Sequence, residues 1–417
     1  MHGEIITIGD ELTSGRTLNL NARYAAGRLT ACGLKVKRIT SVGDNYPMVA
    51  EALQKAVENS RFVIVTGGLG STQDDRTSEI VAKAFNRPLC LDENMFRLIE
   101  RHVRDLGIKL TPSLEKMAWM PNGSRILSPE GRASGFCLVE KGVRLYFLPG
   151  VPEQMRYLLD KVVIPELLSL WPTEAIYSRI LKIFGLREPD LAEIFKQIED
   201  NTGEVVLGFY PHFPEIHITL SLKGEDEKSV SGELDRVEAE IYDLVGSYIF
   251  ANGEETMEEV VGRLLREKGL SVSVAESCTG GLIGHRVTNV SGSSDYFLGG
   301  IICYSNSAKI RLLGVKEATL ARYGAVSDTT AKEMAQGVRE ALGADLGVAV
   351  TGIAGPTGGT DSKPVGTVFV GLASDREVFA HGYRFWGDRE QVKLQSATMA
   401  LDWIRRYVQG DSFLPGI

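Results

Sequence analysis

The sequence predicts an α/β protein made of two α/β sandwich domains with parallel-dominated sheets, joined by a small α+β module. In both end segments, short apolar strands alternate with helical patterns, which is typical of βαβ units and parallel sheets. The middle segment departs from this alternation, so we expect a separate module there. The length of 417 residues leaves room for two or three domains with cores of their own.

We expect the first domain to span residues 1–170. Strand and helix patterns alternate along it, and Pro165 and Pro172 mark its end. Its first elements are expected, in order, as strand Glu4 to Ile8, helix Leu20 to Ala31, strand Val36 to Val42, helix Met48 to Asn59 and strand Phe62 to Thr66.

The middle module is expected over residues 171–252, with two helices and three strands. It carries no basic Gly-x-x-Gly loop of the kind that clamps nucleic acid, and we therefore assign it no chemistry. Its expected elements are strand Ala175 to Phe184, a helix containing Leu191, Ile194, Phe195 and Ile198, strands Glu204 to Tyr210 and Glu215 to Leu222, and a charged helix from Lys228 to Val245.

The third domain is expected over residues 253–417. It opens with a helix, because Thr256 and Glu259 form a capping box ahead of an apolar face at helical spacing. The later elements are expected as a strand starting at Val272, strand Tyr296 to Tyr304, helix Thr329 to Leu342, strand Leu346 to Val350, a hairpin of Gly366 to Ala373 with Glu377 to Phe385, and a closing helix to Tyr407.

Composition and charge exclude several classes of protein. Hydrophobic residues make up 43% and charged residues 24%, as in ordinary globular proteins. The net charge of −8 argues against general binding to nucleic acid backbones. The five cysteines form no CxxC pair and the six histidines are dispersed, which disfavours a zinc site or a disulfide framework. The chain starts on a strand and has no apolar run long enough for a bilayer, so we expect a cytoplasmic protein without a membrane partner.

The C-terminal domain carries a candidate nucleophile and a candidate base. Ser277 lies at the carboxyl end of the strand that begins at Val272, just before a helix expected near Gly280. Open α/β sheets bind ligands at that edge. Lys309 follows the strand Tyr296 to Tyr304, and a desolvated lysine can activate a serine. We therefore expect Lys309 to take the Oγ proton while Ser277 attacks a carboxamide carbon, after which ammonia leaves and water clears the acyl-enzyme.

Other residues of this domain suit the same reaction. Backbone N–H groups around Thr279 and Gly280 would stabilise the oxyanion, and burial would lower the pKa of the lysine toward neutrality. A second glycine-rich loop, Thr351 to Gly359, follows a strand and, together with Arg389, suits the 5′-phosphate of a mononucleotide. This chemistry needs no metal.

Each of these residues also has a purely structural interpretation. Ser277 is a good helix cap, and most lysines are solvated on the surface. Cys278 is a rival nucleophile, although such a cysteine is more often a small buried apolar residue. His285 or His381 could complete a Ser–His pair, and Tyr304 could be a core aromatic residue.

In the N-terminal domain, two glycine-rich turns follow strands. One runs from Ile8 through Gly9, and the other runs from Thr66 to Thr77. Glycines allow a backbone to approach phosphate, and nearby N–H and hydroxyl groups satisfy its oxygens. Asp44, Asp74 and Asp75 could hold a hard divalent cation, which predicts a metal-assisted phosphoryl site. Plain turns and Asp helix caps are the alternative.

The same residues resemble a known family. The N-terminal motifs Gly9-Asp10-Glu11, Thr66-Gly-Gly-Leu-Gly, Asp74-Asp75-Arg76-Thr77 and Phe147 to Met155 resemble the molybdopterin-binding fold, and more closely the N-terminal domain of the CinA family (competence/damage-inducible protein A). The C-terminal motifs resemble its nicotinamide mononucleotide deamidase domain: Ala275 to Gly281, Tyr304 to Lys309, Thr351 to Pro356, Lys363 to Val368 and Gly387-Asp-Arg389. The middle module is similar to the KH-type domain of the family.

The resemblance implies two hydrolytic activities. The C-terminal domain would convert nicotinamide mononucleotide to nicotinate mononucleotide and ammonia without a cofactor. The N-terminal domain would hydrolyse ADP-ribose to AMP and ribose 5-phosphate with Mg²⁺, Mn²⁺ or Co²⁺. Family members are expected to be homodimers in pyridine nucleotide recycling. The alternatives are a nucleotide- or cofactor-binding scaffold linked to DNA uptake or recombination, and an N-terminal pterin binder without turnover.

The resemblance also implies roles for individual residues. The catalytic residues would be Ser277, Lys309 and Tyr304. The C-terminal substrate-binding residues would be Thr279, Gly280, Gly281, Asn306, Thr351, Gly352, Gly355 and Arg389. The N-terminal substrate-binding residues would be Gly9, Asp10, Glu11, Asn21, Thr66, Gly67, Gly68, Gly70 and Asp74, with Asp44 and Asp75 as metal ligands.

Overall fold

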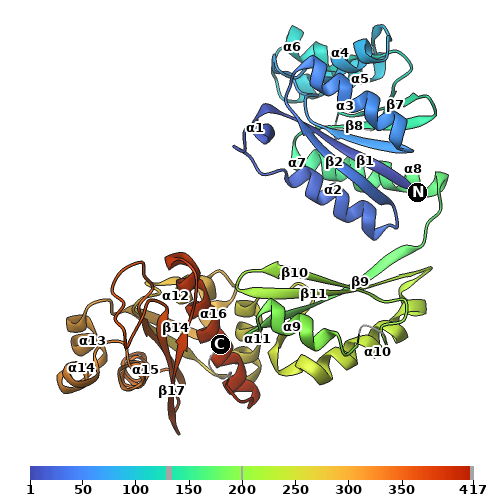
Figure 1. The fold of residues 1–417 in the computed structure, drawn as a ribbon. Coiled ribbons are helices and arrows are strands. Elements are labelled where there is room, and N and C mark those ends of the chain that lie inside the picture. The colour runs from blue at the N-terminus through green and yellow to red at the C-terminus, as the bar shows by residue number, and fades with distance from the viewer. Residues whose placement is uncertain (128–133, 199–200, 414–417) are drawn as a thin grey trace. The chain divides into compact units, whose positions relative to one another are not determined.

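The computed structural model describes residues 1–127, 134–198 and 201–413. By contact density the chain forms two compact units: Met1–Tyr177 with Lys223–Val230, and Ser178–Leu222 with Ser231–Ile417. Within the described residues, no helix is both long and apolar enough to cross a membrane. The sheets combine parallel pairs with covering helices (Figure 1), which confirms the predicted α/β class.

The first unit is built on a six-stranded sheet of order β2-β1-β3-β8-β7-β6. The pairs β1–β2, β1–β3 and β3–β8 are parallel, and β7 and β6 extend the sheet in antiparallel fashion. Its strands are β1 (His2–Ile8), β2 (Lys35–Val42), β3 (Phe62–Thr66), β6 (Arg125–Ile126), β7 (Phe136–Glu140) and β8 (Val143–Leu148); β4 (Leu89–Leu91) and β5 (Trp119–Pro121) form a separate antiparallel pair.

Helices cover both faces of this sheet, and two apolar clusters fill the space between the layers. The face covered by α2 and α7 buries Ala25, Leu29 and Leu158, and the face covered by α3 and α4 buries Leu53 and Val81. The helices of the unit are α1 (Asp10–Thr13), α2 (Leu20–Ala31), α3 (Tyr46–Asn59), α4 (Thr77–Ala84), α5 (Glu93–Asp105), α6 (Pro112–Glu115), α7 (Pro152–Leu158) and α8 (Ile164–Leu170), with a 3₁₀ turn η1 (Lys116–Ala118) and a π-helical turn η2 (Leu159–Val163).

The middle module has its own four-stranded sheet of order β10-β11-β9-β12. The fourth strand, β12, was not predicted; it is only four residues long and gains its place by antiparallel pairing with β9. The predicted helix over residues 191–198 ends earlier, at Phe195, and Ile198 follows in a turn. The elements are β9 (Ala175–Phe184), α9 (Glu188–Phe195), β10 (Val206–His212), β11 (Glu215–Gly224), α10 (Glu227–Val245), η4 (Gly246–Tyr248) and β12 (Ile249–Asn252).

The C-terminal domain is built on a five-stranded sheet of order β14-β13-β15-β16-β17. The strand β13 lies between β14 and β15 and is parallel to both, while β16 and β17 form the predicted antiparallel hairpin. The strands are β13 (Val272–Glu276), β14 (Phe297–Ile302), β15 (Leu346–Gly352), β16 (Thr367–Ala373) and β17 (Val378–Arg384); the helices are α11 (Met257–Lys268), α12 (Leu282–Thr288), η5 (Ser293–Asp295), α13 (Asn306–Leu313), α14 (Glu317–Tyr323), α15 (Asp328–Leu342) and α16 (Arg389–Gln409).

The core of this domain explains why its central strands are so apolar. The strand β13 is buried along its whole length, because apolar clusters pack on both faces of the sheet. The predicted capping box of Thr256 and Glu259 is present at the start of α11. The carboxyl ends of β13, β14 and β15 therefore meet at one edge of a rigid sheet, and α12 and α13 begin beside that edge.

Candidate functional site

Ser277 and Lys309 meet at the carboxyl edge of the C-terminal sheet. Ser277 directly follows β13, and its N–H donates to the carbonyl oxygen of Val350 at 3.0 Å, which continues the strand pairing. Lys309 lies in the first turns of α13, whose N-cap Ser305 accepts from the N–H of Ala308. The Lys309 Nζ donates to the Ser277 Oγ at 2.9 Å. The two side chains are thus in position for direct proton transfer.

Burial controls the protonation of Lys309. The residue is 1% exposed, and its Nζ also donates to the carbonyl oxygens of Cys303 at 2.8 Å and Tyr304 at 3.4 Å. All of these partners are neutral oxygens, so no carboxylate offsets the loss of water around the ammonium group. Burial therefore lowers the pKa of Lys309 from its usual value. A lysine of this kind is a competent base for Ser277.

Glu276 is a residue of this site whose role the sequence did not reveal. Its carboxylate accepts from the N–H groups of Gly281 at 2.9 Å, Ile283 at 3.1 Å and Gly284 at 2.8 Å, and the side chain is buried. The helix α12 starts at Leu282 and not near Gly280, because Gly280 and Gly281 take left-handed φ values of 63° and 99°. Glu276 thus anchors the turn that follows Ser277. An acidic residue inside an apolar strand, just before paired glycines, was the available signal.

The environment of Cys278 disfavours it as the nucleophile. The thiol is 5% exposed, and burial raises its pKa to about 12. Cys278 therefore remains a neutral thiol near pH 7, whereas a nucleophilic cysteine must ionise. The next residue, Thr279, is also fully buried, and its Oγ1 has no hydrogen-bond partner among the described residues.

The histidine alternatives lie elsewhere. The ring of His285 is exposed and contacts Asn289 at 3.4 Å, and His381 makes an edge-on contact with Tyr383. In the part of the chain that the structure describes, neither histidine hydrogen-bonds to Ser277. The geometry therefore favours a Ser–Lys pair over a Ser–His pair.

Tyr304 takes part through two different groups. Its carbonyl oxygen accepts from Lys309, whereas its side chain is 62% exposed, so it is not a core aromatic residue. The hydroxyl of Tyr304 accepts from Arg389 at 3.1 Å, and Arg389 also donates to the carbonyl oxygen of Gly355 at 2.7 Å. Arg389, the first residue of α16, therefore hydrogen-bonds to both the Tyr304 to Lys309 motif and the Thr351 to Pro356 motif.

The remaining predicted residues of this domain lie on the same loops. Thr351 is buried in β15 and donates to the carbonyl oxygen of Ala325, while Asn306 is exposed at the start of α13. A side chain at Gly352 would collide with Val368. Gly355 has a left-handed φ of 85°, and a side chain there would collide with Val365. The N–H of Gly281 is engaged by Glu276 and is not free for a substrate.

The N-terminal residues line one large cavity of about 640 Å³. Both glycine-rich turns and the carboxyl ends of β1 and β3 contribute to it, which is the edge where parallel sheets bind ligands. A side chain at Gly67 would collide with the carbonyl oxygen of Ile8, so this close approach of the two turns requires glycine. The predicted residues that line the cavity are Gly9, Glu11, Asp44, Gly67, Gly68, Gly70, Asp74 and Asp75.

Asn21, Thr66 and Asp10 hold the walls of this cavity together. The amide nitrogen of Asn21 donates to the Thr66 hydroxyl at 3.1 Å and to the carbonyl oxygen of Gly150 at 2.8 Å. The Oδ1 of Asn21 is buried without a partner among the described residues. Asp10 and Asp44 exchange hydrogen bonds, because the N–H of each donates to the carboxylate of the other at 2.9 and 3.2 Å.

The carboxylates of the cavity repel one another. Burial and the neighbouring carboxylates of Asp10, Glu11 and Asp74 raise the pKa of Asp44. Asp75 accepts from the N–H of Thr72 at 3.0 Å. Within the described residues, no three acidic, histidine or cysteine side chains are grouped tightly enough to hold a metal ion. Asp44 and Asp75 fit a cation that takes one or two carboxylates and draws its other ligands from phosphate and water, as Mg²⁺ does.

Comparison with known proteins identifies related chains over the whole length. Three family models match in succession: a probable molybdopterin binding domain over residues 4–169, the damage-inducible protein CinA KH domain over residues 178–251, and the CinA C-terminal domain over residues 254–408. A CinA-like protein of Desulfotalea psychrophila is 39% identical over 411 residues, which cover 98% of this chain and 99% of the relative. A CinA-like protein of Geotalea uraniireducens is 42% identical over 403 residues, or 96% of each chain.

Solved structures match part of this chain. The competence/damage inducible protein CihA from Agrobacterium tumefaciens is 39% identical, with a TM-score of 0.36, and the match covers 37% of this chain and 97% of that one. A CinA superfamily protein from Klebsiella pneumoniae is 31% identical with a TM-score of 0.36, covering 37% of this chain and 99% of that one. Since its full-length relatives share about 40% of their residues with it, this chain belongs to the CinA family.

Proposed function

We propose that the chain is a hydrolase and that its C-terminal domain is a nicotinamide mononucleotide amidohydrolase. The buried hydrogen bond between Lys309 and Ser277, at 2.9 Å, carries this proposal. It joins a nucleophile to a base whose pKa is lowered by burial, and the family resemblance supplies the substrate.

In this mechanism the neutral amine of Lys309 takes the Oγ proton of Ser277, and the oxygen attacks the carboxamide carbon of the substrate. The tetrahedral intermediate collapses when the Lys309 ammonium returns the proton to the departing nitrogen, which leaves as ammonia. Water then attacks the acyl-enzyme and loses a proton to Lys309. The C–O bond to Ser277 breaks, the Lys309 ammonium returns the proton to the Ser277 Oγ, and the carboxylic acid product leaves and ionises. The backbone N–H groups of the Thr279–Gly280 turn are the expected oxyanion donors, because that of Gly281 is engaged by Glu276.

Ammonia release from nicotinamide mononucleotide, without added metal, tests this proposal. We expect turnover by the wild type and none by Ser277→Ala, with both proteins folded. If the wild type binds the nucleotide but releases no ammonia, the domain is a nucleotide-binding module, and the scaffold alternative replaces the enzyme. The expected homodimer and cytoplasmic location belong to the same proposal, and sedimentation measures the former.

A second activity, hydrolysis of ADP-ribose to AMP and ribose 5-phosphate, is proposed for the N-terminal domain. The cavity of about 640 Å³ supports it, because two glycine-rich turns and the carboxylates Asp44 and Asp75 face the same space. A divalent cation bound there would neutralise the phosphates and polarise the P–O bond under attack. Of the protein's own groups, the turns would position the phosphates, and Asp44 and Asp75 would hold the cation.

Substitution of Asp75 tests whether the N-terminal domain hydrolyses ADP-ribose or only binds a ligand. We expect Asp75→Ala to abolish AMP production while the protein stays folded and the C-terminal activity is unchanged. Asp75→Asn keeps an acceptor for the N–H of Thr72 but not the charge, and it should be equally inactive. Full activity of both variants would remove Asp75 from the metal site. Binding of ADP-ribose without turnover by the wild type would favour the cofactor-binding alternative.

A further inference from the structure

A second cavity lies beside the large cavity of the N-terminal unit. It has a volume of about 350 Å³, within the range of small-molecule sites. The two cavities share part of their lining, including Leu69, Gly70 and Asp75 of the second glycine-rich turn. The turn that is proposed to bind phosphate therefore forms a partition between two spaces, and a ligand with two halves joined by a diphosphate could occupy both.

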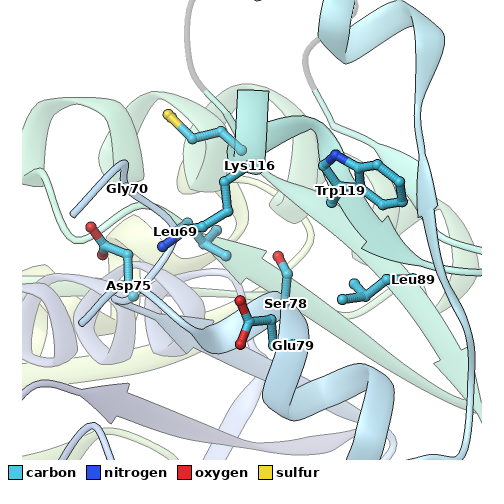
Figure 2. A pocket seen from close by; sticks show the side chains of 10 residues that line it. Leu69, Gly70, Asp75, Ser78, Glu79, Leu89, Lys116 and Trp119 are labelled. Atoms are coloured by element: carbon cyan, nitrogen blue, oxygen red, sulfur yellow. The ribbon is translucent and has the colours of Figure 1, made fainter. Parts of the chain in front are cut away.

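The smaller cavity has the walls of a slot for a flat apolar ring. Leu69, Leu89, Met117 and Trp119 supply its apolar lining. Figure 2 shows Trp119 and Leu89 on one side of the space and Leu69 with Asp75 on the other. Trp119 belongs to β5, where pairing with β4 fixes it opposite Leu91, and its side chain remains 38% exposed. An exposed indole on a paired strand offers a face for stacking.

Polar groups complete the slot at its base. Ser78 and Glu79, in the first turn of α4, line the same cavity (Figure 2). The Ser78 hydroxyl and the Glu79 carboxylate, one oxygen of which already accepts from Arg76 at 3.1 Å, can accept hydrogen bonds from an exocyclic amino group. Apolar walls, an aromatic face and such acceptors together match an aminopurine ring better than a sugar or a phosphate.

Lys116 supplies positive charge at the partition. It is the only lysine or arginine among the described residues that line the two cavities. Its Nζ donates to the carbonyl oxygen of Thr72 at 2.7 Å, and the N–H of Thr72 donates to Asp75. Lys116 is thus held beside the shared turn that carries Asp75. A diphosphate that crosses the partition would meet this ammonium group.

We propose that the smaller cavity is the base subsite of the N-terminal site: the adenine ring stacks on Trp119, the diphosphate passes Lys116, and the ribose phosphate half occupies the larger cavity. This inference rests on the proposed ADP-ribose hydrolysis, because that substrate has an adenosine half and a ribose half joined by a diphosphate. It assigns the half of the substrate that each cavity receives.

Calorimetric binding of AMP and ribose 5-phosphate to the full chain, at a fixed MgCl₂ concentration, tests the subsite. We expect Trp119→Leu to weaken AMP binding about tenfold, the usual loss for one stacked base, and to leave ribose 5-phosphate binding unchanged. Trp119→Phe should restore most of the affinity. The matched control is Leu91→Ala, on the paired strand β4 and 39% exposed, which does not line the cavity and should bind AMP like the wild type.

Lys116→Met tests the charge separately. We expect it to abolish the preference for AMP over adenosine, a loss of about tenfold, while Lys116→Arg retains that preference. If Trp119→Leu does not fold, Trp119→Phe still decides the matter, because AMP should quench indole emission in the wild type and not in that variant.

Three results would overturn the subsite: unchanged AMP binding in Trp119→Leu, an equal loss in Leu91→Ala, or AMP quenching that persists in Trp119→Phe. The hydrolysis assay is read independently. ADP-ribose turnover with AMP binding insensitive to Trp119 leaves the proposed function standing and removes the subsite. AMP binding that depends on Trp119, without ADP-ribose turnover, leaves the subsite standing and removes the proposed hydrolysis.

Discussion

In the C-terminal site the reacting side chains are almost completely buried, whereas the carboxylates of the N-terminal cavity are half-buried or exposed. Ser277 and Lys309 already contact each other and are held by the backbone carbonyl oxygens of Val350, Cys303 and Tyr304. The N-terminal cavity of about 640 Å³ is lined by the carboxylates of Glu11, Asp44, Asp74 and Asp75, and its described lining includes no lysine or arginine. In the C-terminal site the nucleophile and the base already form a hydrogen bond. The N-terminal cavity instead collects negative charge, which suits a bound cation.

The largest effect is expected from the nucleophile. Ser277→Ala should reduce ammonia release by a factor on the order of 10⁴ to 10⁶, because the methyl group of alanine cannot form the acyl-enzyme. Hydrolysis of ADP-ribose by the same protein should not change. The adjacent variant Cys278→Ala is the control, and it should retain activity within a few-fold, since its thiol has a pKa of about 12. Loss of activity in Cys278→Ala with retention in Ser277→Ala would reverse the assignment.

The base should give the next largest effect. Lys309→Arg and Lys309→Met should each lower kcat by about 10²- to 10⁴-fold, because arginine stays protonated and methionine accepts no proton. In the wild type, kcat should rise with pH as Lys309 loses its proton. Because burial lowers its pKa, this rise should occur below the usual range of lysine. A pH profile that is flat there would contradict the role of Lys309 as the base.

Substitution of Glu276 should show how far the activity of the Ser277–Lys309 pair depends on the turn that Glu276 anchors. In Glu276→Gln, a neutral amide faces three N–H donors, so we expect a loss of about 2–4 kcal/mol in the free energy of unfolding and roughly tenfold in kcat, with little change in KM. Urea unfolding and steady-state kinetics measure the two effects.

The control for Glu276 is Glu333→Gln. Glu333 accepts from the N–H of Lys316 and the hydroxyl of Thr319, away from the Ser277–Lys309 pair. We expect this variant to lose about 1 kcal/mol or less and to keep its kcat. Equal losses of kcat in both variants would show that Glu276 acts only through general stability.

The smallest effect is expected in the acidic cavity. The pKa of Asp44 is raised in the fold, so the folded state binds more protons than the unfolded state between the two pKa values, and stability falls as pH rises through that window. Asp44→Asn should therefore raise the free energy of unfolding at neutral pH by up to about 0.5 kcal/mol. It should also reduce the stabilisation by Mg²⁺ in thermal melts. A less stable variant with unchanged response to Mg²⁺ would contradict the charge argument.

Much of the fold follows from local sequence patterns. The helix Leu20–Ala31 and the strands Phe62–Thr66 and Ala175–Phe184 have the predicted bounds, because apolar spacing and capping residues act within a few positions. The strand β12 and the strand pair β4–β5 that holds Trp119 were missed, since their short sequences become strands only by pairing with distant segments.

The candidate site was predictable to a similar degree. Ser277 and Lys309 follow parallel strands that are adjacent in the sheet, so the topology alone brings them together. The part of Glu276 was not predictable, because three backbone N–H groups converge on it only once the glycine turn has formed. The contribution of Tyr304 to the environment of Lys309 comes from its carbonyl oxygen, which residue identity does not reveal.

The burial of Lys309 among neutral oxygens also couples folding to the concentration of hydrogen ions. In the unfolded chain this amine titrates near the ordinary lysine value of about 10.4. In the folded domain its pKa is lower, so the folded state holds fewer protons than the unfolded state between the two values. Folding in that range therefore releases hydrogen ions, and this residue makes the domain more stable as the solution becomes more alkaline. The heat of refolding should accordingly vary with the ionisation enthalpy of the buffer, and the contribution of Lys309 to that variation should be lost in Lys309→Met.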